Sequence, residues 1–265
     1  MICACPLFSG SSGNAVYLSD GRTSLLVDAG QCCRTIENAL SSIDVLPASL
    51  AAILITHEHI DHIRGVGVLM RRYHLPVYAN EATWTAMRRD PNIGRIDPAL
   101  IHILPIGEKT EIGDMCVQSV STPHDAIDPV GYRVTAGQRE ISVFTDLGFA
   151  DPELLNSITS SDLIFFESNY DREMLFGGPY PWHLKRRIDG LKGHLSNSDC
   201  AAALQTLLQG GVARFVLSHL SKENNTPELA RASAVDSLSS CGAAHGHDYL
   251  LEIAPRYTHG HIWEL

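Results

Sequence analysis

The segment from Ala51 to His62 constrains the fold of this chain more than any other. Its first five residues, Ala51–Ile55, are uncharged and apolar, which is the pattern of a strand buried on both faces. Four potential metal ligands follow within six residues, namely His57, His59, Asp61 and His62. If the backbone stays extended, His57 and His59 point to the same side and can reach one ion. Asp61 and His62 then fall on the turn beyond and can face a second ion.

The ligand types narrow the choice of metal. Imidazole and carboxylate ligands without thiolate suit Zn²⁺, Mn²⁺ or Fe²⁺. The alternative interpretation is a histidine-rich surface loop. The dense H-x-H-x-D-H order directly behind a buried strand favours a metal site over such a loop.

Length and composition indicate one large domain over residues 1–265. The chain is 45% apolar and 19% charged, so it can bury a sizeable core. It has neither the roughly 18 consecutive apolar residues of a membrane helix nor the features of a signal peptide at its start. We therefore expect no membrane partner and a cytoplasmic location. The seven cysteines are scattered and odd in number, which favours reduced packing residues over disulfides.

The order of elements favours an α/β layered sandwich. Strands are predicted around residues 2–8, 15–19 and 23–30, followed by an amphipathic helix at 32–42 and the strand at 51–55. A further helix is expected over 63–73, and a closing hairpin from 249–253 and 261–265. The small loop Ser9–Asn14 either lets backbone N–H groups approach an anion or is a simple hairpin turn. The net charge of −10 leaves the substrate class open.

Three later residues, each behind a predicted strand, are further candidate ligands. They are His124 after 117–122, Asp146 after 141–145 and His219 after 213–217. A carboxylate has two oxygens, so Asp146 can bridge two ions roughly 3.5–4 Å apart. For His124 or Asp146 alone, a hydrogen-bonded residue at a strand end would be the better explanation. Their order behind the first motif favours ligands.

Thr56-His-Glu-His-Ile-Asp-His62 resembles the signature of the metallo-β-lactamase fold superfamily. This resemblance implies a four-layer αββα sandwich as a single domain, with two divalent metal ions, zinc or manganese. It assigns one ion to His57, His59, His124 and Asp146, and the other to Asp61, His62, His219 and Asp146. Such ions lower the pKa of bound water towards roughly 7, so the implied reaction is metal-assisted hydrolysis.

Residues outside the ligand set resemble the phosphodiesterase branch of that superfamily. Di-iron oxygen reductases carry a carboxylate where this chain has His59, so a redox role is not expected. In tRNase Z and its relatives, a glutamate after a strand and a Gly-His-Ser/Thr motif form a proton-donating pair. By resemblance, Glu167 orients His194, and His194 acts on the departing oxygen, with Asp61 as a further catalytic residue. The alternative for His194 is a helix-terminal residue packed on the sheet.

Over residues 8–227 the chain is similar to bacterial YycJ/WalJ-type proteins. The shared features are the Ser-Gly-Ser-Ser-Gly-Asn loop, Gly-Pro-Tyr-Pro-Trp and Leu-Ser-His-Leu-Ser-x-Glu-Asn-Asn. The resemblance implies a 5′-to-3′ DNA exonuclease connected with DNA repair or with cell-wall and division regulation. Only about 70 positions separate Asp146 from His219, which leaves no room for a β-CASP cap domain. Substrate contacts are then expected from Lys185, Arg186, Arg187, Trp182 and Asn197, with Lys192 and Tyr180 nearby.

Two other functions remain open from the sequence. One is a small-molecule hydrolase, acting on a cyclic phosphodiester or a thioester at the same metals. The other is a regulatory binding protein in which the metals only shape a surface. A polar open groove favours the nuclease, a closed apolar pocket the small-molecule enzyme, and an occluded metal the binding protein.

Overall fold

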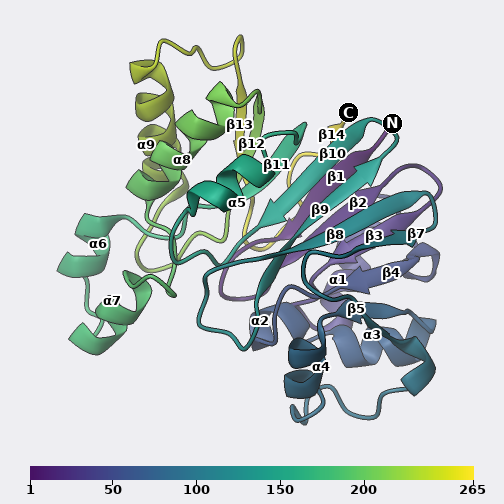
Figure 1. Cartoon of the computed structure of the whole chain (residues 1–265). Coiled ribbons are helices and arrows are strands. Elements are labelled where there is room, and N and C mark those ends of the chain that lie inside the picture. The colour runs from purple at the N-terminus through teal and green to yellow at the C-terminus, as the bar shows by residue number, and fades with distance from the viewer. The chain divides into compact units, whose positions relative to one another are not determined.

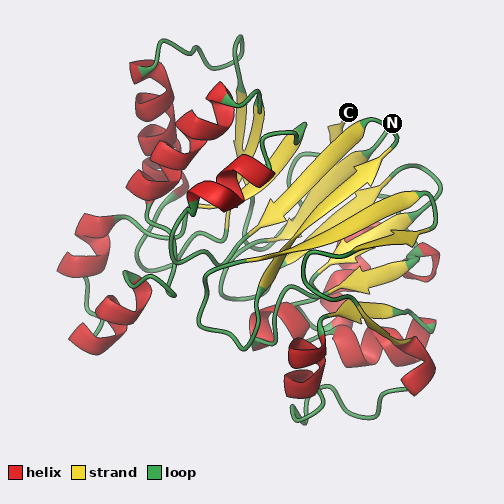
Figure 2. Ribbon diagram, in the orientation of Figure 1, coloured by secondary structure: helices red, strands yellow, loops and turns green.

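The structure consists of two compact units (Figures 1 and 2). In each unit, parallel strands end close to the candidate site residues. The computed structural model describes residues 1–265. The first unit comprises residues 1–121, 126–139 and 255–265, and the second comprises residues 122–125 and 140–254.

The first unit contains a seven-stranded sheet in the order β14-β1-β2-β3-β4-β5-β6. Its strands are β1 (Cys3–Phe8), β2 (Ala15–Ser19), β3 (Ser24–Val27), β4 (Ala52–Leu54), β5 (Val77–Ala79), β6 (Ile101–Ile103) and β14 (Trp263–Glu264). Strands β3 to β6 are parallel, whereas β14, β1, β2 and β3 pair antiparallel. An antiparallel trio, β7 (Lys109–Ile112), β8 (Met115–Ser121) and β9 (Val130–Ala136), also belongs to this unit.

Helices of the first unit pack on this sheet and bury its core. They are α1 (Cys33–Ser41), α2 (Ile60–Ile63), α3 (Val66–Tyr73) and α4 (Glu81–Met87), with short 3₁₀ turns at Pro47–Ser49 and Pro98–Leu100. The core joins Leu26 and Ile53 of the sheet to Ile36, Leu69 and Trp84 of the helices. Because apolar burial contributes about 25 cal/mol per Å², these side chains supply much of the unit's stability.

The second unit is a parallel sheet with helices on it. Its strands are β10 (Arg139–Phe144), β11 (Leu163–Glu167), β12 (Arg214–Ser218) and β13 (Leu250–Ile253), and each pairs parallel with the next. Its helices are α5 (Pro152–Ser157), α6 (Arg172–Gly177), α7 (Trp182–Ile188), α8 (Asn197–Gln209) and α9 (Pro227–Ser240). These elements occupy all of the chain between Asp146 and His219, which agrees with the expected lack of a cap insertion.

One expectation about the elements held only in part, and another was wrong. The helix predicted over 63–73 is split into α2 and α3, because the amide of Gly65 donates to the carbonyl of Ala29 (2.8 Å). The last two strands form no hairpin: β13 pairs with β12, and β14 pairs with β1. All seven cysteines are free thiols, as expected. None of the helices has both the length and the apolar character needed to cross a bilayer.

Candidate metal centre

Asp28 organises the candidate ligands of the first unit. It follows β3, is 2% exposed, and has a left-handed backbone (φ 62°) that is uncommon outside glycine. Because β3 and β4 are parallel, their carboxyl ends meet at one sheet edge, and Asp28 there accepts hydrogen bonds from Thr56 N (2.9 Å) and Thr56 Oγ1 (2.9 Å). Its second oxygen also accepts from His62 Nδ1 (2.8 Å). This one carboxylate therefore fixes both ends of the histidine motif.

The same contacts orient two imidazoles. Since the Thr56 hydroxyl donates to Asp28, its oxygen accepts from His57 Nδ1 (3.0 Å). His62 Nδ1 donates to Asp28, so Nε2 is the acceptor nitrogen of both rings. The ring centroid of His57 lies 4.0 Å from that of His62 and 4.6 Å from that of His59. The motif thus gathers three imidazoles in one place, with His59 at the start of α2.

The loop Ser9–Asn14 supports this motif from the side. Asn14 N donates to the carbonyl of Asp61 (2.8 Å), Asn14 Nδ2 donates to His62 Nε2 (3.0 Å), and Asn14 Oδ1 accepts from Gly10 N (2.8 Å). The amide of Gly13 donates to the carbonyl of Gly10. Of the two sequence interpretations, anion contact or a turn, these internal bonds favour a turn that positions Asp61 and His62. The positioning role of Asn14 was not predicted.

Gly30 provides a direct test of this support. A Cβ atom there would lie 1.7 Å from the carbonyl oxygen of Asp61, so the two segments can approach only if residue 30 is glycine. We expect Gly30→Ala to lower the free energy of unfolding by about 1–3 kcal/mol, the usual cost of overpacking, and to reduce bound metal. Urea unfolding and metal analysis measure both. Gly177→Ala is the matched control, because a Cβ at Gly177 meets nothing within 4 Å. Equal metal content in the Gly30 variant would contradict this role.

The second unit brings four predicted residues together. One ligand atom from each of Asp146, Glu167, His194 and His219 lies within 4.8 Å of the others. Because β10, β11 and β12 are parallel, the residues after them emerge at one edge of the sheet. Asp146 (φ 60°) and His219 (φ 57°) share the left-handed backbone of Asp28. Strained backbone concentrates at functional sites, which supports such a site at this edge.

Glu167 is the centre of this cluster and is fully buried. Its Oε1 accepts from His194 Nδ1 (2.9 Å) and His219 Nδ1 (2.8 Å), and its Oε2 accepts from the amides of Leu147 and Leu195. Burial alone would raise the pKa of Glu167, but the imidazole of His194 and the hydrogen bonds from both histidines outweigh it and lower the pKa. With both oxygens engaged, Glu167 orients its neighbours and is poorly placed to bind a metal itself.

His124 follows the same design. It is 3% exposed, and its Nδ1 donates to the carbonyl of Gly193 (2.9 Å). Its Nε2 lies 3.5 Å from an oxygen of Asp146. Burial lowers the pKa of His124, which keeps the ring neutral at pH 7, the form that binds metals.

Taken together, the donor set fits divalent metal ions. Four imidazoles, those of His57, His62, His124 and His219, donate through Nδ1 to protein acceptors. This leaves Nε2 as the ligand atom of His57, His124 and His219, whereas Nε2 of His62 accepts a hydrogen bond from Asn14 Nδ2 (3.0 Å). This second layer of hydrogen bonds is a general feature of metal-binding histidines. With the carboxylates of Asp61 and Asp146 added, the ligands are nitrogen and oxygen only, as zinc and manganese accept.

Of the predicted substrate residues, some are exposed and others are buried. Trp182 and Arg186 are exposed on α7, and Arg187 pairs with Asp125. Lys185 is buried, and its ammonium donates to two backbone carbonyls, which favours a structural role over the predicted substrate contact.

Asn197 is also buried. It exchanges two hydrogen bonds of 2.8 Å with the side-chain amide of Asn225 and accepts a third from Ser168 Oγ. Asn225 in turn donates to the carbonyls of Ser168 and Asn169, and Asn169 Nδ2 donates to the carbonyl of His219 (2.7 Å). This network ties together the loops that follow β11 and β12 and precede α8. It favours a positioning role for Asn197, which the sequence alone did not reveal.

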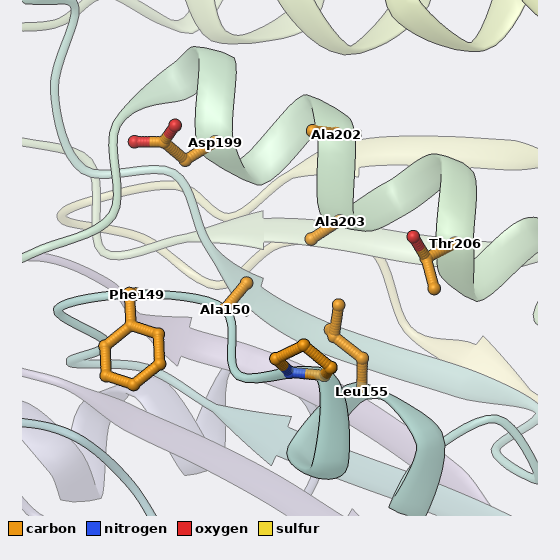
Figure 3. A pocket seen from close by; sticks show the side chains of 8 residues that line it. Phe149, Ala150, Leu155, Asp199, Ala202, Ala203 and Thr206 are labelled. Atoms are coloured by element: carbon orange, nitrogen blue, oxygen red, sulfur yellow. The ribbon is translucent and has the colours of Figure 1, made fainter.

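A cavity of about 400 Å³ lies between α5 and α8 of the second unit (Figure 3). It is lined by Phe149, Ala150, Pro152, Leu155, Asp199, Ala202, Ala203 and Thr206. The carboxylate of Asp199 is engaged by Arg172 (2.8 Å) and Ser196 (2.6 Å). With neither histidine nor cysteine in its lining, this cavity is distinct in chemistry from the histidine clusters.

Comparison with known proteins identifies relatives over nearly the whole chain. The family model described as "Beta-lactamase superfamily domain" matches residues 23–220. Exodeoxyribonuclease WalJ of Streptococcus pneumoniae is 41% identical over 243 residues, covering 92% of this chain and 90% of that protein. Exodeoxyribonuclease YycJ of Bacillus anthracis is 39% identical, covering 92% and 91%.

A solved structure supports the same fold. The metallo-β-lactamase fold protein YhfI of Bacillus subtilis superposes with a TM-score of 0.75 at 16% identity, and the match covers 100% of both chains. The predicted fold class, an α/β sandwich of the metallo-β-lactamase type, is confirmed, as is the resemblance to YycJ/WalJ-type proteins. The extent of a single domain over 1–265 stays a prediction.

Proposed function

Because the chain belongs to the beta-lactamase superfamily and is a metal-dependent hydrolase, we propose that it is an exonuclease that removes nucleotides from the 5′ end of DNA. The names of two relatives, at 41% and 39% identity over 92% of the chain, support DNA as the substrate. The 5′-to-3′ polarity is the expectation from the motifs. A cytoplasmic location and a part in DNA repair stay predictions.

The observation that carries the proposal is the shared orientation of three histidines described above, His57, His124 and His219. A histidine that only packs in a core has no need to present the same nitrogen as two others. Here His57 is oriented by Asp28 through Thr56, His124 by the carbonyl of Gly193, and His219 by Glu167. Such hydrogen bonds to Nδ1 fix the tautomer and the orientation of each ring, as a histidine that binds a metal through Nε2 requires.

We assign two divalent ions, zinc or manganese, to the predicted ligands. The assignment includes His57, His59, Asp61, His62, His124, Asp146 and His219, with Asp146 shared by both ions. It rests on their order in the chain and on the geometry within each unit. When bound, such ions make hydroxide available from water at neutral pH and stabilise charge on a phosphate.

The protein's own groups supply the proton. His194 Nδ1 donates to Glu167, which leaves Nε2 as the second ring nitrogen, and the side chain is 20% exposed. At Nε2 the ring can hold a proton for the oxygen that leaves when a phosphodiester bond breaks. Glu167 holds the orientation of this ring through the hydrogen bond from Nδ1. Asp61 is also a ligand in this assignment. Its backbone carbonyl accepts a hydrogen bond from Asn14 N, which holds the backbone of Asp61 in place.

Digestion of end-labelled DNA tests the function. Metal-stripped protein is supplied with Mn²⁺ or Zn²⁺ and given single strands and duplexes labelled at the 5′ or the 3′ end. We expect metal-dependent release of mononucleotides from the 5′ end, and loss of that activity in Asp61→Ala/His62→Ala. Intact DNA and RNA at full metal occupancy would reject the proposal. In that case a cyclic phosphodiester or a thioester becomes the substrate to test, and failure on these as well would leave the binding protein.

A further inference from the structure

Two aromatic side chains lie side by side on the surface of the α6–α7 arm, which we define as residues 172–188. Phe176 at the end of α6 is 37% exposed, and Trp182 at the start of α7 is 62% exposed. Their ring centroids are 5.8 Å apart with a tilt of 53°. Figure 1 shows the two helices at the left edge, set apart from α5, α8 and α9 of the same unit. Large aromatic rings exposed as a pair usually serve a binding purpose.

The arm is held in shape by its own buried lysine. Lys185 of α7 is 8% exposed, and its ammonium donates to the carbonyls of Phe176 and Gly178, both at 2.7 Å. It thereby satisfies carbonyl groups at the end of α6, which have no partner within the helix. Burying an ammonium is unfavourable unless it is well hydrogen-bonded. The geometry of the exposed pair is therefore fixed from inside the arm.

The charge of this region differs from that of the whole chain. Residues 172–192 contain five basic side chains, Arg172, Lys185, Arg186, Arg187 and Lys192, and two acidic ones, Glu173 and Asp189. The complete chain has 20 basic and 30 acidic residues. Arg172 pairs with Asp189 and Asp199, and Arg187 pairs with Asp125, so the positive charge that favours a polyanion as the partner lies on the exposed Arg186 and Lys192.

The arm also leads directly to the proposed proton donor. The amide of His194 donates to the carbonyl of Ile188, the last residue of α7 (2.8 Å). At 1.5 Å per residue, Trp182 lies roughly 9 Å along the helix from Ile188. Stacked nucleotides are spaced by about 3.4 Å, so this is the length of roughly three nucleotides.

We propose that Phe176 and Trp182 form a stacking platform for unpaired bases of the DNA strand that His194 acts on, with the exposed Arg186 beside its phosphates. This inference rests on the proposed function. Aromatic rings stack on any base, whereas paired bases in a duplex keep their faces covered. The platform therefore selects single strands or frayed ends. It would serve a protein whose fold lacks a cap to enclose the strand.

Tryptophan fluorescence provides a direct readout of binding. The chain has three tryptophans, and Trp84 and Trp263 are 1% and 5% exposed, so Trp182 alone is open to a ligand. We expect a short oligothymidylate with phosphorothioate linkages to quench the tryptophan fluorescence of the metal-loaded protein. An abasic strand of equal length and charge should quench little. Strong quenching by the abasic strand would overturn the stacking role.

Variants then separate stacking from charge. Stacking contributes about 1–3 kcal/mol per base, so Trp182→Ala or Phe176→Ala should weaken oligothymidylate binding roughly 5- to 150-fold, measured with a labelled strand. Trp182→Phe should restore most of the affinity. Leu46→Ala, which truncates another exposed apolar side chain (73%), is the control and should change nothing. Unchanged affinity in Trp182→Ala would overturn the platform.

The platform and the proposed function fail separately. If the protein degrades DNA while Trp182→Ala binds and cleaves single strands normally, the platform is wrong and the exonuclease stands. If the protein cleaves no nucleic acid yet shows base-dependent quenching, the function is wrong, and the arm stacks the bases of a strand that the protein binds without cleaving it. If quenching comes only from added protein partners and never from DNA, the arm is a protein-docking surface and the inference is rejected.

Discussion

Replacing His194 with alanine is expected to lower the rate of DNA cleavage by about 10²- to 10⁴-fold, the usual contribution of a positioned acid or base. The substitution also takes one of four hydrogen-bond donors from the buried carboxylate of Glu167, so the free energy of unfolding should fall as well, and the rates are compared under conditions in which the variant is folded. Because the variant keeps every ligand in our assignment, bound metal should stay the same. Steady-state kinetics with a labelled strand, together with metal analysis, check both statements.

The leaving group distinguishes a proton donor from a structural residue. A p-nitrophenyl ester of thymidine 5′-phosphate releases an anion that needs no proton, so His194→Ala should lose far less activity on this ester than on DNA. A merely structural histidine would lower both rates equally, and that result would contradict the assignment. Because His194 shares Glu167 with His219, unchanged metal content is the condition for interpreting either rate.

The strand-end residues could be predicted from the sequence because their signal is local. An apolar run followed closely by histidine or aspartate predicts a buried strand and a side chain at its end, as at His57 after β4 and Asp146 after β10. Parallel pairing then brings the ends of neighbouring strands to one edge, which accounts for Asp146, Glu167 and His219 within one cluster. No long-range information is needed for either step.

Contacts between distant positions could not be predicted in this way. Asn14 reaches Asp61 and His62 across 47 and 48 positions, and nothing near Asn14 indicates this partner. Lys185 stands in a Lys-Arg-Arg run that indicates a charged surface, yet its place on α7 turns it inward to the end of α6. The split between α2 and α3 likewise depends on Gly65 meeting Ala29. In each case a tertiary contact overrides a local pattern.

Glu167→Gln is expected to damage both stability and function, although the two side chains have nearly the same volume. Every group around the carboxylate is a donor: two imidazoles at Oε1 and two backbone amides at Oε2. A carboxamide has one accepting oxygen, and its NH₂ group would face donors on the other side. Removing one partner of a buried charged network costs about 3–5 kcal/mol, so the free energy of unfolding in urea should fall by that amount.

Metal binding and the rate of DNA cleavage should fall further in Glu167→Gln than in a variant that loses only one histidine. Changes in groups that support ligands usually cost about 10- to 100-fold in metal affinity or activity, and Glu167 supports both His219 and the proposed donor His194. We expect weaker metal binding and a cleavage rate at least as low as that of His194→Ala, whereas the exposed Glu228→Gln should match the wild type. Normal metal affinity with normal cleavage in Glu167→Gln would show that the two histidines hold their orientation without this carboxylate. The reason for burying a charge at the end of β11 would then lie in stability alone.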